Sequence, residues 1–106
     1  MMWVLQSSPA DSANDPSAPE AVPLTFRVSP GSTKTIGRAT GADFVIDTAL
    51  VSRVHCRLEA GSDAIEVVDL SSTNGTYVNN ARVDRARLND GDRLRVGRVE
   101  FTVRSV

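Results

Sequence analysis

The chain has 106 residues, of which 41% are hydrophobic and 24% charged, and its formal net charge is -1. A chain of this length is expected to form one domain around a single core. No apolar run approaches the roughly 20 residues of a membrane-spanning helix. After residue 26 the chain carries 12 basic and 10 acidic groups, an excess too small for a non-specific nucleic-acid binder. With one cysteine and one histidine, the sequence offers neither an internal disulfide nor a zinc cluster.

The first 22 residues predict a short strand followed by a loop. We expect residues 1–6, which include Trp3, Val4 and Leu5, to pair with the rest of the domain, although an unpaired N-terminus is the alternative. Residues 7–22 hold three of the five prolines along with Ser, Ala and Asp, a composition that favours a flexible loop. The apolar start is too short for a secretion signal and lacks its basic flank, so we expect a cytoplasmic protein.

Residues 23–106 alternate between apolar and polar side chains with the period of a β-strand. The alternation is clearest at Val99, Phe101 and Val103, which charged or polar residues separate. It recurs in residues 24–28, 54–58 and 94–96. Clusters of Gly, Pro, Asn and Asp interrupt these stretches about every ten residues, and no window shows a sustained helical stripe. The pattern predicts an all-β, antiparallel sandwich or barrel whose loops carry the function.

Three polar clusters lie in the predicted loops: Gly37-Arg38, Ser52-Arg53-Val54-His55 and Thr73-Asn74-Gly75. Each cluster alone has an ordinary structural interpretation. An isolated Arg38 predicts a solvated charge, and the hydroxyls of Ser52 and Thr73 would bond their own turns. Asn74-Gly75 alone is the strongest hairpin pattern in the chain, typical of a type I′ turn. Their functional interpretation depends on their order.

The order and spacing of these clusters resemble the forkhead-associated (FHA) domain, a phosphothreonine-binding β-sandwich. The motifs are Gly-Arg at 37–38, Ser-Arg-x-His at 52–55, Ser-Thr-Asn-Gly-Thr at 72–76 and Asp-Gly-Asp at 90–92. The resemblance covers roughly residues 23–106, and Trp3 to Leu5 match the family's first strand. It implies a sandwich of about eleven short strands with the ligand loops at one end.

The resemblance also implies a phosphopeptide site made by Arg38, Ser52, Arg53, Thr73 and Asn74. A phosphothreonine carries nearly two negative charges and three acceptor oxygens, so its receptor needs a cation and several donors. The planar fork of an arginine suits two phosphate oxygens, and hydroxyl groups add further donors. The family's asparagine holds the backbone of the bound peptide.

Further residues are assigned to supporting roles. By resemblance, Gly37, His55 and Gly75 support the loops of the site. Leu50 and Val51 directly precede Ser52, and these aliphatic side chains suggest an apolar residue downstream of the phosphothreonine.

The sequence does not favour an enzyme. Ser52 and His55 lie three residues apart, but no Gly-x-Ser-x-Gly nucleophile motif is present, and the matching histidine of the family is structural. Cys56 alternates with apolar residues and is expected to be buried. The run at 90–92 lacks the other carboxylates of a calcium loop and predicts a turn. We therefore expect no catalytic residue, cofactor or metal.

The predicted function is a recognition module that binds a phosphothreonine-containing partner made by an upstream Ser/Thr kinase. We expect a monomer in isolation that binds neither nucleic acid nor membrane. The alternative is a phosphate-independent scaffold that uses the faces of the sandwich.

Overall fold

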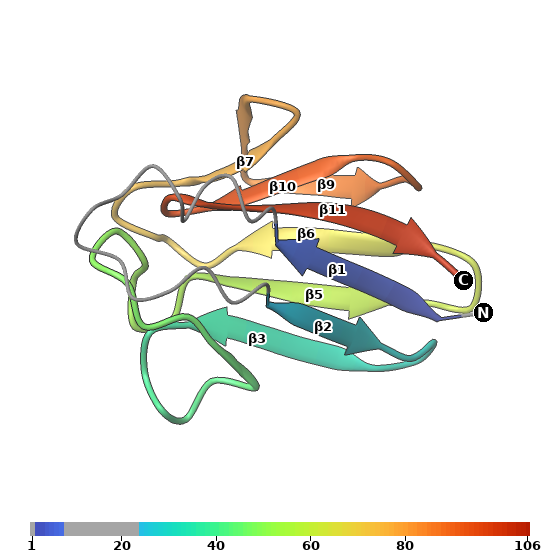
Figure 1. The fold of residues 1–106 in the computed structure, drawn as a ribbon, viewed down its shortest axis with the longest axis horizontal. Coiled ribbons are helices and arrows are strands. Elements are labelled where there is room, and N and C mark those ends of the chain that lie inside the picture. Colours follow the sequence, from blue (N-terminus) through green and yellow to red (C-terminus); the bar gives the residue numbers. More distant parts are fainter. Residues whose placement is uncertain (1, 8–23) are drawn as a thin grey trace.

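The computed structural model describes residues 2–7 and 24–106, which form eleven strands in two sheets packed face to face (Figure 1). The strands are β1 (Trp3–Ser7), β2 (Thr25–Val28), β3 (Thr33–Gly37), β4 (Phe44–Val45), β5 (Cys56–Ala60), β6 (Ile65–Asp69), β7 (Thr76–Val78), β8 (Ala81–Val83), β9 (Arg85–Leu88), β10 (Arg93–Val96) and β11 (Val99–Ser105). The predicted all-β sandwich is confirmed. Among these residues, no helix is long and apolar enough to cross a membrane.

The six-stranded sheet has the order β2-β1-β11-β10-β7-β8, and the five-stranded sheet has the order β4-β3-β5-β6-β9. Strand β1 pairs with β11 on one side and β2 on the other, so the N-terminal strand is interior to its sheet. Of the predicted loop at 7–22, Ser7 belongs to β1 and the remainder lies outside the described residues. The antiparallel prediction holds except between β3 and β4, which pair in parallel.

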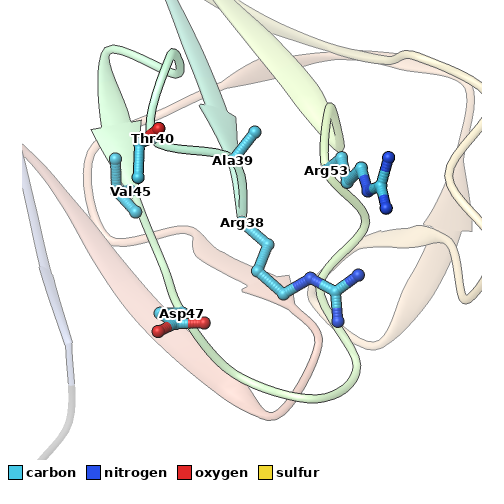
Figure 2. Close-up of a pocket in the computed structure, with 6 residues that line it drawn as sticks. All are labelled: Arg38, Ala39, Thr40, Val45, Asp47 and Arg53. Carbon is cyan, nitrogen blue, oxygen red and sulfur yellow. The ribbon is translucent and has the colours of Figure 1, made fainter.

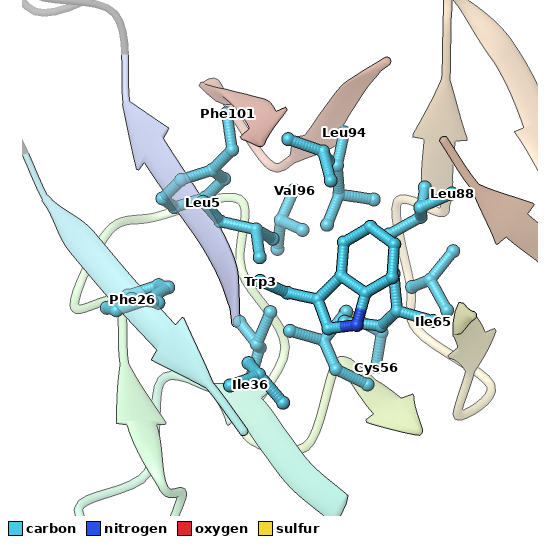
Figure 3. Close-up of a cluster of buried hydrophobic side chains, with 14 of the residues drawn as sticks. Trp3, Leu5, Phe26, Ile36, Cys56, Ile65, Leu88, Leu94, Val96 and Phe101 are labelled. Carbon is cyan, nitrogen blue, oxygen red and sulfur yellow. The ribbon is translucent and has the colours of Figure 1, made fainter. Parts of the chain in front are cut away.

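The core lies between the sheets, and its residues follow the predicted alternation. In Figure 3, Trp3, Leu5 and Phe101 of the six-stranded sheet face Ile36, Cys56 and Ile65 of the other sheet. All six are buried. At the β2 and β4 edges the rings of Phe26 and Phe44 stack with centroids 4.3 Å apart, which joins the two sheets at that side.

One part of the predicted alternation is wrong. The alternation over residues 54–58 predicts that Val54 shares a buried face with Cys56 and Leu58, but β5 begins only at Cys56 and the Val54 side chain is 54% exposed. Val54 lies in the preceding loop, where the strand period no longer determines side-chain direction. The loop consequently presents an apolar side chain at its surface.

Candidate phosphopeptide site

Three loops meet at the end of the sandwich opposite the two termini (Figure 1). They follow β3, precede β5 and connect β6 to β7, and they carry the three polar clusters of the sequence. Strands β3, β5 and β6 are consecutive neighbours in the five-stranded sheet and alternate in direction. The end of β3, the start of β5 and the end of β6 therefore lie side by side, which brings together residues distant in sequence.

Backbone hydrogen bonds hold the Gly37-Arg38 segment against the loop that contains Ser52. The Arg38 N–H donates to the Ser52 carbonyl at 2.9 Å, and the Ala39 N–H donates to the Arg53 carbonyl at 3.2 Å. A Cβ atom on Gly37 would lie 2.1 Å from the Arg53 carbonyl oxygen. Glycine is required here because the two backbones approach so closely.

A second contact joins Ser52 to the loop between β6 and β7. The Thr73 N–H donates to Ser52 Oγ at 3.0 Å, which leaves the proton of that hydroxyl available to donate. Thr73 is exposed, and its hydroxyl has no hydrogen-bond partner among the described residues. The Asn74 side-chain amide donates to the Leu50 carbonyl at 3.2 Å, which leaves its Oδ1 as an acceptor facing no described donor.

His55 lies beneath these loops and is fully buried. Its Nδ1 accepts the Ser52 N–H at 3.0 Å, and its Nε2 lies 2.8 Å from the Gly75 carbonyl oxygen. Because a backbone N–H can only donate, Nδ1 must be the unprotonated nitrogen, and Nε2 then carries the hydrogen and donates to Gly75. The ring thus fastens the Ser52 loop to the Gly75 loop.

A polar network centred on Asp69 lies under the 70–75 loop and was not predicted from the sequence. The Asp69 carboxylate accepts hydrogen bonds from the Ser72 hydroxyl, the Ser72 N–H and the Thr76 hydroxyl. The Ser72 hydroxyl in turn accepts the Gly75 N–H at 3.0 Å. An Asp at a strand end, three residues before a Ser in a turn sequence, is a pattern that predicts such side chain to backbone bonds.

The charged form of Asp69 is favoured by this network. Burial raises the pKa of the Asp69 carboxyl, but the hydrogen bonds from Ser72 and Thr76 together outweigh burial. The pKa of Asp69 is therefore lower than its ordinary value. The network that shapes the loop depends on an ionised carboxylate.

The type I′ hairpin that Asn74-Gly75 alone would predict is absent. Strand β6 before it and strand β7 after it belong to different sheets, so the segment crosses between them. Gly75 still needs its conformational freedom, with φ at +89° and Arg82 Nε 2.7 Å from where a Cβ would lie. The tight hairpin is instead at Asn79-Asn80, whose φ values of 50° and 68° fit a type I′ turn between β7 and β8.

Arg38 and Arg53 are two exposed cations of this end. They line an open hollow of about 610 Å³ together with Ala39, Thr40, Val45 and Asp47. In Figure 2 both guanidinium groups extend to the same side, away from the Asp47 carboxylate. Neither forms an ion pair or side-chain hydrogen bond with any described residue. Both guanidinium groups are therefore available to an anion.

The two residues expected to select the downstream peptide residue have different positions. Val51 is only 2% exposed and belongs to the core, with Cγ2 2.8 Å from where a Cβ on Gly97 would lie. Its side chain does not reach the surface, which corrects the expectation. Leu50 is half-buried beside the same glycine, and Val54 is exposed on the same loop. Leu50 and Val54 are therefore the larger apolar side chains of this loop that reach the surface.

Three other residues considered in the sequence have structural roles: Asp90, Asp92 and Cys56. Asp90 and Asp92 accept backbone N–H groups of Ser105 and Asn89, as turn residues do. Cys56 is buried, and burial raises the pKa of its thiol to about 12, so it stays protonated. Within residues 2–7 and 24–106, no group of three or more His, Cys, Asp and Glu residues could hold a metal ion.

Comparison with known proteins places this arrangement in a family. Over 78 residues the chain is 44% identical to the ABC transporter ATP-binding/permease protein Rv1747 of Mycobacterium tuberculosis, a stretch covering 74% of this chain and 9% of that protein. The chain therefore spans a small part of that relative's length. It is also 41% identical over 80 residues to the FHA domain-containing protein FhaA of the same organism, covering 76% of this chain and 15% of FhaA.

A solved structure covers the whole fold. An FHA domain from a structural and functional analysis of phosphothreonine-dependent FHA domain interactions superposes with a TM-score of 0.80 and 34% identity, covering 100% of this chain and 98% of that one. The FHA domain family model matches residues 34–97, which contain all three polar clusters. This chain belongs to the FHA domain family.

Proposed function

We propose that this domain is a phosphopeptide-recognition module that binds phosphothreonine-containing segments of partner proteins. The observation that carries the proposal is the convergence of Arg38, Ser52 and Thr73. Hydrogen bonds of 2.9 Å from Arg38 N to Ser52 O and of 3.0 Å from Thr73 N to Ser52 Oγ hold these residues together. One unpaired guanidinium and two hydroxyl groups match the charge and acceptor oxygens of a phosphothreonine.

Each residue has a distinct role in the proposed complex. Arg38 binds two phosphate oxygens, the Ser52 and Thr73 hydroxyls donate to the phosphate, and Arg53 adds charge beside them. Asn74 holds the peptide backbone through the amide that now bonds Leu50. Charge-assisted hydrogen bonds contribute roughly 1.5 to 3 kcal/mol each, so a few of them, less the association costs, give an affinity near micromolar. Such an affinity suits reversible signalling downstream of a Ser/Thr kinase.

The relatives support this class of function. An FHA domain that superposes on this chain comes from work on phosphothreonine-dependent interactions, and the FHA domain of FhaA was solved with the intracellular domain of Rv3910 bound. Because the partner must be phosphorylated by an ATP-using kinase, we place the module in the cytoplasm.

We infer that the module acts by binding and not by catalysis. The pair that resembles a nucleophile and base is Ser52 and His55, but the Ser52 N–H occupies Nδ1 and the other ring nitrogen bonds Gly75. Neither nitrogen is available to take a proton from the Ser52 hydroxyl. This geometry supports the structural role of the histidine.

Arg38→Ala tests the proposal. We expect it to weaken binding of a phosphothreonine peptide at least tenfold, about 1.4 kcal/mol, because the main cation facing the phosphate is lost. Fluorescence polarisation with matched phosphothreonine, phosphoserine and unphosphorylated peptide libraries measures the change, and thermal unfolding shows that the fold is intact. Ser52→Ala should act in the same direction.

Arg87→Ala is the matched control for Arg38→Ala. Arg87 is an exposed arginine of β9 without an ion pair among the described residues, and its removal changes net charge equally. It should leave affinity unchanged. Equal binding of phosphorylated and unphosphorylated peptides, or an Arg38→Ala variant that binds normally, would favour the phosphate-independent scaffold instead.

A further inference from the structure

A row of three side chains crosses the outer face of the six-stranded sheet beside the phosphopeptide end. Tyr77 of β7 is paired with Arg82 of β8 on one side and with Arg95 of β10 on the other. Directly paired residues of neighbouring strands point to the same face of the sheet. The guanidinium carbon of Arg95 lies 4.2 Å from the centre of the Tyr77 ring. We call Arg82, Tyr77 and Arg95 the Arg82–Arg95 strip.

The strip begins at the loop that carries Thr73 and Asn74. Arg82 Nε lies 2.7 Å from the position of a Cβ atom on Gly75, so the arginine side chain rests on the backbone of that glycine. Gly75 directly follows Asn74, the residue proposed to hold the peptide backbone. A peptide that leaves Asn74 over this edge therefore meets Arg82 first.

Within the part of the chain that the structure describes, neither arginine of the strip is bound to an acidic side chain. Glu100 of β11 is the cross-strand neighbour of Arg95, but its carboxylate bonds Arg93. Among the described residues, neither guanidinium forms an ion pair or a hydrogen bond, whereas three other outward-facing arginines do. The paired ones are Arg57 with Glu59, Arg85 with Glu59 and Glu66, and Arg93 with Glu100. Stacking on Tyr77 holds Arg95 in place without occupying its N–H donors, so less side-chain entropy is lost when it binds an anion.

We propose that the Arg82–Arg95 strip is a second subsite for the same ligand, which binds Asp or Glu side chains that flank the phosphothreonine. This inference rests on the proposed function of the loop site. The two arginines are two strand spacings apart, about 10 Å, which an extended peptide covers in about three residues. The strip therefore selects closely spaced acidic residues in the partner segment.

The test uses phosphothreonine peptides in which a pair of glutamates is moved along a neutral alanine and glycine background on both sides of the phosphothreonine. At one or more positions the glutamates should strengthen binding about three- to tenfold over the neutral phosphopeptide. Arg82→Gln and Arg95→Gln should remove this advantage and leave affinity for the neutral phosphopeptide unchanged. The advantage should also shrink as salt concentration rises.

Arg82→Glu and Arg87→Gln complete the design. Arg82→Glu should turn the glutamate advantage into a penalty, while Arg87→Gln, with the same loss of charge on the other sheet, should preserve the advantage. The proposal is overturned if no glutamate position helps, if Arg87→Gln has the same effect as Arg82→Gln, or if Arg82→Gln weakens the neutral phosphopeptide equally. Failure of the loop site itself has a different signature, since neutral peptides would then bind equally with and without phosphate.

Discussion

Gly37 lies where the β3 backbone passes closest to the loop that carries Ser52 and Arg53. A methyl group at this position would lie 2.1 Å from the Arg53 carbonyl oxygen, a contact that no rotamer change relieves because the obstructing atom belongs to the backbone. The Arg38 N–H to Ser52 carbonyl bond of 2.9 Å lies directly beside it. Separation of these two segments would move the proposed phosphate-binding cation away from the proposed phosphate-binding hydroxyl.

Gly37→Ala is therefore expected to lower stability by about 3 kcal/mol and to weaken phosphopeptide binding at the same time. Chemical denaturation and fluorescence polarisation measure the two effects. Gly41→Ala is the matched control, because a Cβ there has no neighbour within 4 Å and the backbone does not require glycine. Normal stability and affinity in Gly37→Ala would mean that the two backbones do not approach this closely.

At the scale of elements, the segment from Asp69 to Thr76 is shaped by one carboxylate. It crosses from the five-stranded to the six-stranded sheet without backbone pairing to a neighbouring strand over most of its length, so side chains supply its hydrogen bonds. The Asp69 carboxylate accepts three of them, and His55 fastens Gly75 from below. The presentation of Thr73 and Asn74 depends on this network.

The lowered pKa of Asp69 makes this segment sensitive to acid. Folding lowers the pKa below the ordinary value of 3.8, so the unfolded state binds the proton more tightly than the folded state. The stabilisation is fully present above the unfolded pKa and is lost as pH falls through the folded pKa. We expect the urea midpoint of the wild type to fall from about pH 5 downward.

Asp69→Asn should lower stability at neutral pH and make the midpoint less dependent on pH in that acidic range, because the titrating group is gone. Urea denaturation at a series of pH values provides the measurement. Asp63→Asn, at an exposed aspartate in the turn between β5 and β6, should keep the pH dependence of the wild type. Identical acid profiles for wild type and Asp69→Asn would contradict the proposed role of the carboxylate.

At the scale of the whole molecule, the N-terminal strand is an interior part of the sandwich. The family match at residues 34–97 does not include β1, yet β1 lies between β2 and β11 and pairs with both. Leu5 has no exposed surface and Trp3 is 5% exposed. The sandwich that holds the ligand loops in place therefore depends on β1, a strand far from these loops in sequence.

Leu5→Ala should destabilise the domain by about 3 kcal/mol through the loss of apolar contacts and the cavity left behind. The fluorescence of Trp3, the single tryptophan, reports unfolding in denaturant because the ring is buried in the folded state. Gln6→Ala, at the exposed neighbour on the same strand, should change stability by less than about 0.5 kcal/mol. Equal effects of the two substitutions would mean that β1 does not contribute to the core.

The all-β class and the apolar faces of most strands could be predicted from the sequence, because alternation with period two is a local property of the backbone. It also indicated the three polar clusters and the residues Arg38, Ser52, Thr73 and Asn74, whose roles in binding remain predictions. The type of turn was harder to predict. The Asn74-Gly75 sequence is typical of a hairpin, but this segment crosses from one sheet to the other.

The arrangement of the loops, and which of their side chains reach the surface, could not be predicted from the sequence. Val51 and Val54 are the same residue type in one loop, yet Val51 is 2% exposed and Val54 is 54% exposed. Neither the Asp69 network nor the position of Arg82 against Gly75 follows from strand periodicity. Loop side chains take their directions from contacts between segments far apart in the chain, and these contacts exist only after both sheets have packed together.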